Sequence, residues 1–209
     1  FAGNSITLDK GSGLYTLTDF YGTGDFDFSA GQKIYDHQIY SKFNIVVSKY
    51  NRCTMALDWS GMLVCNRTLY GESILVDNDK NMYVSGKFVG MMDVDLSPAV
   101  NNISTADTTH FDYFMAKYDS NGVFQWVNQF TYGGGFDFDV SLDNSNHILL
   151  AGNFKDHIGI LHNNMSQGNL TSNGAASDLF CMKLDLGGNL IWSKRIGGTY
   201  DEYYQGMSV

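Results

Sequence analysis

Residues 112–126 read DYFMAKYDSNGVFQW: a run of strand-forming residues, a turn around DSNG, and a second strand that carries a tryptophan. The same pattern stands at 178–192, DLFCMKLDLGGNLIW, and more loosely at 44–59, NIVVSKYNRCTMALDW. Asn and Gly accept the positive φ that hairpin turns need, so each stretch predicts an antiparallel hairpin. A shared period indicates a repeat architecture. The tryptophans lie 67 and 66 residues apart, at Trp59, Trp126 and Trp192.

Two further strands precede each hairpin. The first strands, 4–9, 72–77 and 139–143, each end in an aspartate before a turn rich in Gly, Asn and Asp. Each second strand ends in a phenylalanine eleven residues after that aspartate, at Phe20, Phe88 and Phe154. Each unit of about 67 residues therefore holds four antiparallel strands.

The third strand of a unit is apolar on both faces, which is typical of a sheet covered on both sides. Four-stranded sheets packed face to face around an axis make a β-propeller. We therefore expect an all-β fold of propeller blades. A β-sandwich is the alternative, but it does not predict a strict period of about 67 residues.

The repeat gives the expected domain boundaries. Blades are predicted at 1–71, 72–138 and 139–205, and residues 206–209, GMSV, align with the first strand of a further blade. Propellers usually have about four to eight blades. The ring is therefore expected to be completed by a longer chain or by other subunits, and the repeated tryptophans and phenylalanines are expected to be core residues.

The joint pattern resembles the SBBP-type β-propeller repeats, which run from a "YSI-x-VD" strand through "G-N-x-Y-V-x-G-x-F-x-G-x-x-D-F-D" to "D-I-F-V-A-K-Y-D-x-N-G-x-x-W" and "GG". The second copy carries it best, with SILVDNDKNMYVSGKFVGMMDVD at 73–95 followed by 112–126. The third copy departs from it, with GIL at 159–161 in place of the acidic DFD segment. The resemblance implies a propeller scaffold of large, often secreted or surface-exposed proteins. It implies no catalytic residues.

Composition narrows the classes of function. The chain has a net charge of −9 and scattered Lys and Arg, so the basic surface that nucleic-acid binding needs is not expected. No apolar run approaches the roughly 18 residues of a membrane-spanning segment, so membrane insertion is not expected either. The sequence contains no G-x-S-x-G, Walker or H-E-x-x-H motif, and no cofactor is expected.

The expected function is a non-enzymatic extracellular or cell-surface scaffold, adhesion protein or filament, whose loops bind protein partners or copies of itself. One alternative is a propeller that binds a glycan or another small ligand through aromatic side chains in its connections. A second alternative is an enzyme with an axial site built from several blades. The aromatic candidates for glycan binding are Tyr35, Tyr40, Tyr132, Phe136, Tyr200, Tyr203 and Tyr204.

Several acidic residues are candidate sites. Asp77, Asp79 and Asn81 form a D-x-D-x-N loop whose oxygens at alternate positions suit Ca²⁺. The alternative is a β-turn whose side chains bind their own backbone. The pairs Asp25/Asp27 and Asp93/Asp95 suit acid–base or metal chemistry if both members point one way from a strand. Their alternative is an acidic edge that discourages strand addition.

Cysteines and asparagines complete the candidates. In one register of the first copy, Cys53 falls in the hairpin turn and Cys65 beyond the fourth strand, too far apart to bond; a second register places them across a hairpin, where a disulfide is feasible. The first register keeps the loop lengths constant. Four sequons in predicted connections are candidates for N-glycans: Asn66, Asn102, Asn164 and Asn169.

Overall fold

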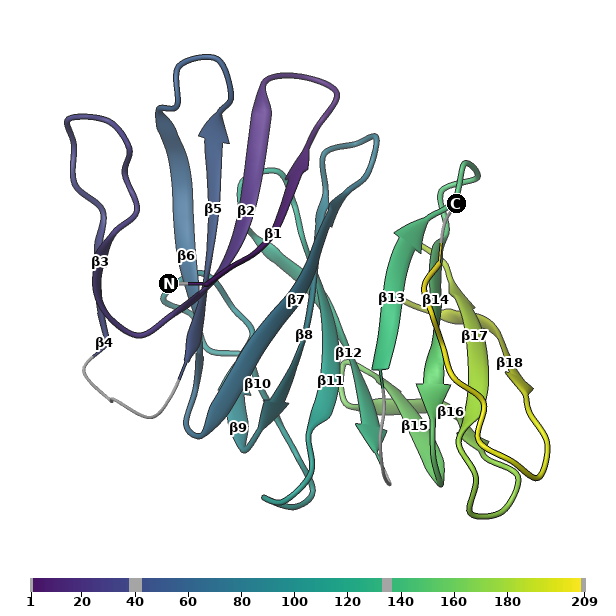
Figure 1. Cartoon of the computed structure of the whole chain (residues 1–209). Coiled ribbons are helices and arrows are strands. Elements are labelled where there is room, and N and C mark those ends of the chain that lie inside the picture. The colour runs from purple at the N-terminus through teal and green to yellow at the C-terminus, as the bar shows by residue number, and fades with distance from the viewer. Residues whose placement is uncertain (1, 38–42, 133–136, 208–209) are drawn as a thin grey trace. The chain divides into compact units, whose positions relative to one another are not determined.

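The computed structural model describes residues 2–37, 43–132 and 137–207 of the 209-residue chain (Figure 1). These residues form antiparallel β-strands and turns, with no helix among them. The prediction of an all-β fold is therefore confirmed. In the described ranges, no helix is long and apolar enough to cross a membrane.

The chain divides into two compact units. The first unit contains Phe1–Thr108 and Met115–Gln125, and the second contains Thr109–Phe114 and Trp126–Val209. Strands β11 (Asp112–Tyr118) and β12 (Phe124–Tyr132) contribute residues to both units.

In the first unit, four consecutive antiparallel strands form a sheet of order β1-β2-β5-β6, and the hairpin β9-β10 extends it beyond β6. A further hairpin, β3-β4, makes a two-stranded sheet, and β7 of the hairpin β7-β8 packs on β1, β2 and β5. The strands are β1 (Ala2–Leu8), β2 (Gly13–Phe20), β3 (Gly22–Asp25), β4 (Ile34–His37), β5 (Asn44–Asn51), β6 (Leu57–Cys65), β7 (Thr68–Val76), β8 (Met82–Val89), β9 (Met91–Asp93) and β10 (Asn102–Ser104).

In the second unit, four antiparallel strands again follow one another, in the order β13-β14-β17-β18. The hairpin β15-β16 pairs through β15 with β12, and the sheet that contains β12 has the order β16-β15-β12-β11-β8-β7. The strands are β13 (Asp137–Leu142), β14 (Ile148–Phe154), β15 (His157–His162), β16 (Met165–Thr171), β17 (Asp178–Leu184) and β18 (Leu190–Ile196).

All twelve strands expected from the repeat are present, with ends that shift by a few residues at most. The long connections between second and third strands, expected to be loops, instead contain the short hairpins β3-β4, β9-β10 and β15-β16. Gly206 and Met207 are not in a strand, unlike the expectation for 206–209, and Ser208 and Val209 lie outside the described residues.

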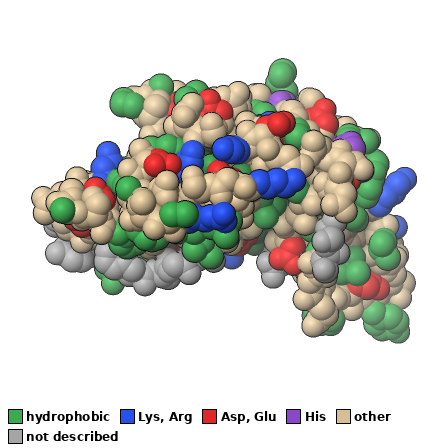
Figure 2. Space-filling model, turned by 90° about the horizontal axis from the view of Figure 1, so that it is seen from above, with side chains coloured by type: hydrophobic (Ala, Val, Ile, Leu, Met, Phe, Trp, Pro, Cys, Tyr) green, Lys and Arg blue, Asp and Glu red, His purple; other side chains and the backbone are tan. Residues whose placement is uncertain are grey.

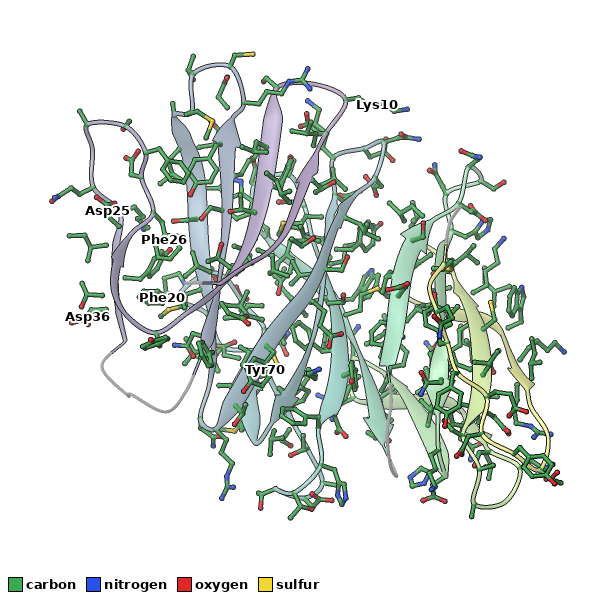
Figure 3. All side chains as sticks on the ribbon, in the orientation of Figure 1. Lys10, Phe20, Asp25, Phe26, Asp36 and Tyr70 are labelled. Carbon is green, nitrogen blue, oxygen red and sulfur yellow. The ribbon has the colours of Figure 1, made fainter. Side chains whose placement is uncertain are left out.

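The repeated phenylalanines Phe20, Phe88 and Phe154 are fully buried. Figure 3 shows Phe20 and Phe26 close together beside the hairpin that carries Asp25 and Asp36. Their rings meet edge to face, with centroids 5.3 Å apart. Because Phe20 lies in β2, this aromatic contact fixes the β3-β4 hairpin to the sheet that contains β2.

The cross-strand register decides between the two alignments of the first copy. Lys49 lies opposite Trp59, as Lys183 lies opposite Trp192. Cys53 is exposed in the β5-β6 turn, Cys65 is buried at the far end of β6, and both are free thiols. The disulfide, and the register that allowed it, are therefore wrong, because the length of β6 separates the two cysteines.

Candidate functional site

The tryptophans of the first two repeats make the same contact. Trp59 Nε1 donates a hydrogen bond to the backbone oxygen of Ser120 at 3.1 Å. Trp126 Nε1 donates to the backbone oxygen of Leu186, also at 3.1 Å. Both acceptors are the second residue of a third-to-fourth-strand turn, one repeat further along the chain. Each contact therefore joins one repeat to the next, and we call it a junction.

Each junction also contains a turn glycine under the indole ring. Gly122 has a φ of 80° and Gly188 a φ of 83°, a region that side chains disfavour. A Cβ atom would come within 3.3 Å of Trp59 at Gly122 and within 2.9 Å of Trp126 at Gly188. Glycine is therefore required for two reasons: the backbone has a positive φ, and the indole ring leaves no room for a Cβ atom.

A polar network that runs from the buried Asn128 to the surface completes the junction of the second unit. Asn128 Nδ2 donates to the backbone oxygen of Gly188 at 2.8 Å, and Asn128 Oδ1 accepts from His162 Nδ1 at 2.7 Å. Asn163 Nδ2 donates to His162 Nε2 at 3.2 Å. Burial lowers the pKa of His162 below 6.5, although the nearby charge of Asp185 opposes the shift. The imidazole therefore acts as a neutral link, with a proton on Nδ1.

The junction of the first unit is built differently and leaves a cavity. Gly61 stands two residues after Trp59, where Asn128 follows Trp126, and Leu96 stands eight residues after Phe88, where His162 follows Phe154. Leu96 packs so close to Gly61 that a Cβ there would lie 2.7 Å from its side chain. Because Gly61 has no side chain, this position cannot donate a side-chain hydrogen bond to the next turn, as the Asn128 amide does in the second unit.

The cavity has a volume of about 190 Å³. That is room for several water molecules or one small polar molecule. Aromatic rings of Trp59 and Phe124 line it together with the polar side chains of Asp95, Ser97 and Asn121. Ring faces beside hydrogen-bonding groups can hold a small polar ligand with a flat apolar side.

The paired carboxylates have a different role from the expected acid–base one. Asp25 accepts hydrogen bonds from the backbone N–H groups of Asp27 and Lys33, and these lower its pKa. Asp93 accepts from Asp95 and Asn101 at the same offsets. In each pair the second aspartate lies beyond the strand, so the two do not share a strand face. They order the turns that follow β3 and β9.

Two tyrosines connect these turns to a strand of another sheet, Tyr50 from β5 and Tyr118 from β11. Tyr50 Oη donates to the backbone oxygen of Phe26, and Tyr118 Oη donates to that of Val94, both at 2.7 Å. The third repeat has Leu184 at this position and lacks the acidic segment as well. The tyrosine and the acidic turn therefore occur together in the first two repeats and are both missing from the third.

The D-x-D-x-N loop is held by hydrogen bonds to Asp77. Its Oδ1 accepts from the N–H groups of Asp79 and Asn81, and its Oδ2 accepts from the Asn81 amide and the Tyr83 hydroxyl. Asp143 caps the equivalent turn of the third repeat in the same way. The described residues hold no cluster of three or more His, Cys, Asp or Glu placed to bind a metal. Calcium at this loop stays a prediction.

The remaining candidates are scattered rather than gathered. All four sequon asparagines are exposed, although Asn102 lies in β10 and Asn169 in β16 rather than in loops. Among the aromatics, Tyr35 packs on Phe26, whereas Tyr200 and Tyr203 are exposed. Tyr40, Phe136 and the side chain of Tyr132 lie outside the described residues. None of the expected aromatics lines the cavity, and the residues that do were not predicted.

The tryptophans of the three repeats are not equally buried. Trp126 is 5% exposed and Trp59 is half-buried, but Trp192 is 37% exposed. The expectation that all three are core residues therefore holds for Trp126, is only partly met by the half-buried Trp59, and is wrong for Trp192, over which the described residues place no turn. The spacing of Gly122 and Gly188, 66 residues against 67 for Trp59 and Trp126, is the sequence signal that could have revealed the junctions.

Comparisons with known proteins do not extend this description. Neither a protein-family model nor a curated protein matches the chain. The repeated junction is therefore the ground on which a function can be argued.

Proposed function

We propose that this protein is a non-enzymatic, extracellular or cell-surface scaffold built from propeller repeats of the SBBP type, which presents its connections to partners. The carrying observation is the junction itself, in which one indole N–H binds the turn of the following repeat twice in succession. Polar groups that could do chemistry are used to hold turns in place. Such use of charged groups favours a structural role over catalysis.

The connections suit presentation to partners. The turns at 97–100 and 173–175 are exposed. Buried aromatic residues hold the neighbouring strands in place. The exposed sequons of the β9-β10 and β15-β16 hairpins fit glycans on the same connections. Figure 2 shows acidic, basic and hydrophobic side chains interspersed on the surface in view.

Adhesion of cells to coated surfaces tests this proposal. The chain is produced by secretion, its glycans are mapped by mass spectrometry, and adhesion is compared with that of a variant whose turns 97–100 and 173–175 are Gly-Ser tracts. We expect the variant to keep the thermal unfolding of the original chain and to lose adhesion. Adhesion no better than on an albumin-coated surface would contradict the proposal.

A second candidate function rests on the cavity beside Trp59. An indole face, a carboxylate and an amide are the groups that bind one sugar ring, by stacking and by hydrogen bonding. Saturation-transfer NMR with a panel of monosaccharides tests it. A bound sugar should lose its signal with Asn121→Ala and keep it with Asn189→Ala, a substitution in the next turn. No transfer from any sugar would remove this candidate.

A further inference from the structure

We propose that copies of this chain associate head to tail, with β18 of one copy against the β3-β4 hairpin and the β5-β6 turn of the next. The inference deepens the proposed scaffold function and rests on it. It follows from the two internal junctions, because the chain also carries both halves of a third junction, and each half is exposed.

The first half is the face of β18. Trp192 holds the repeat position of Trp59 and Trp126, yet 37% of its surface is exposed. Strand β18 is the last of its sheet, whereas the equivalent strands β6 and β12 pair with the next repeat's hairpin, β9-β10 or β15-β16. An indole and a strand edge are thus presented together, as in the internal junctions.

The second half is the β3-β4 hairpin with the turn at residues 52–56. The hairpin is the counterpart of β9-β10, since Asp25 and Asp93 accept backbone hydrogen bonds at the same offsets. Phe28, eight residues after Phe20, corresponds to Leu96 but is 64% exposed. The β5-β6 turn is exposed throughout, while Gly122 and Gly188 in its counterparts are buried under indoles.

The β5-β6 turn has a methionine where its counterparts have glycine. Met55 has a φ of 58° and is exposed. A methionine side chain is flexible and makes favourable contacts with aromatic rings, so it can lie along an indole that arrives from another chain. The β5-β6 turn is one residue longer than its counterparts, and counted from Lys49 the backbone oxygen of Arg52 stands where that of Ser120 stands after Lys117.

Charge also favours this pairing. Strand β18, LIWSKRI, has two basic residues and no acidic one. Residues 22–36 contain three aspartates and one lysine, an excess of two negative charges. Arg195 forms an ion pair with Asp178 of its own chain, so the positive charge that β18 offers to this hairpin is that of Lys194. The two faces differ from each other, so the contact is heterologous and can repeat into a ring or a filament.

Sedimentation of the full chain over a range of concentrations tests the proposal. We expect masses above that of the monomer, and weaker association at high salt. Trp192→Glu and Phe28→Asp should each weaken self-association by about tenfold or more, because each removes a central aromatic contact. Mixed together, the two variants should form dimers that grow no further, since each keeps one intact face.

Met91→Ser is the matched control. Met91 is 46% exposed in β9 and belongs to neither proposed face, so this variant should associate like the original chain. A chain that stays monomeric at every concentration would overturn the proposal, as would equal effects of Met91→Ser and Trp192→Glu. Adhesion is scored separately on the original chain: adhesion by a chain that does not self-associate refutes this inference alone, and self-association without adhesion refutes the scaffold function alone.

Discussion

Trp126 and Trp192 hold the same repeat position in different surroundings, and their substitutions should differ accordingly. Trp126→Ala removes a buried ring and its hydrogen bond to Leu186, so we expect a loss of about 3–5 kcal/mol in the free energy of unfolding. Trp192→Ala should cost less than about 1 kcal/mol in the monomer. Urea unfolding at low protein concentration measures both, and equal losses would contradict the difference in burial.

The two reasons for glycine at position 188, the positive φ and the close approach of Trp126, can be separated by experiment. Gly188→Ala brings both a disfavoured φ and a Cβ within 2.9 Å of Trp126 and His162. Gly174 has a similar φ of 78°, but a Cβ there would have no atom within 4 Å, so Gly174→Ala has the conformational cost alone, about 1–2 kcal/mol. We expect Gly188→Ala to destabilise clearly more in thermal unfolding. Matching losses would show that the ring does not press on the turn.

His162 should make stability depend on pH. Its pKa in the folded chain lies below 6.5, so the unfolded chain binds more protons as the pH falls through 6.5 and below. Folding is therefore weakened by acid in that range, where Nε2 must give up its hydrogen bond from Asn163. His162→Gln cannot titrate there. The difference in unfolding free energy between the original chain and this variant should change between pH 7.5 and 5, and a constant difference would contradict the neutral link.

At the scale of elements, the tyrosine anchors should act locally. Tyr118→Phe removes the hydroxyl that donates to the buried Val94 carbonyl, at a cost of about 1–3 kcal/mol. Hydrogen exchange should speed up at residues 95–101, which follow β9. Tyr50→Phe is the matched control, since it acts on the turn after Phe26. Equal effects of both substitutions on 95–101 would mean that the anchors are not local.

The strands were predictable because their signals recur. Each of the twelve has alternating or continuous apolar residues and a turn rich in Gly, Asn or Asp beside it, repeated at a constant step. The hairpins β9-β10 and β15-β16 were not, because their stability comes from pairing with β6 and β12, residues that lie far away in the sequence. Strands that are stabilised by distant residues need no recognisable local sequence pattern.

In the candidate site, too, the parts built from neighbouring residues could be predicted, and the parts built from residues far apart in the sequence could not. The aspartate at the first turn of each repeat could be recognised, and its oxygens bind the turn that follows it. The cavity beside Trp59 could not, because it depends on Gly61 and Leu96 meeting across two repeats. Comparing repeats with each other, Gly61 against Asn128 and Leu96 against His162, is what reveals how the two junctions come to differ.

For the whole molecule, the two compact units should respond separately to loss of a junction. Repeat proteins draw stability from contacts between neighbouring repeats, so damage at one junction is felt mainly beside it. The Trp59 junction lies within the first unit and the Trp126 junction within the second. Trp59→Phe and Trp126→Phe keep an aromatic ring and remove one N–H donor each, a loss of about 1 kcal/mol.

Hydrogen exchange measured by mass spectrometry over the full chain distinguishes local from global effects. Trp59→Phe should speed exchange in β5 and β6 and leave β17 and β18 unchanged, whereas Trp126→Phe should do the reverse. Trp192→Phe is the control, since its N–H has no turn to bind within the described residues. If either junction variant raised exchange evenly from β1 to β18, the chain would unfold as one cooperative body, and the division into two units would have no energetic meaning.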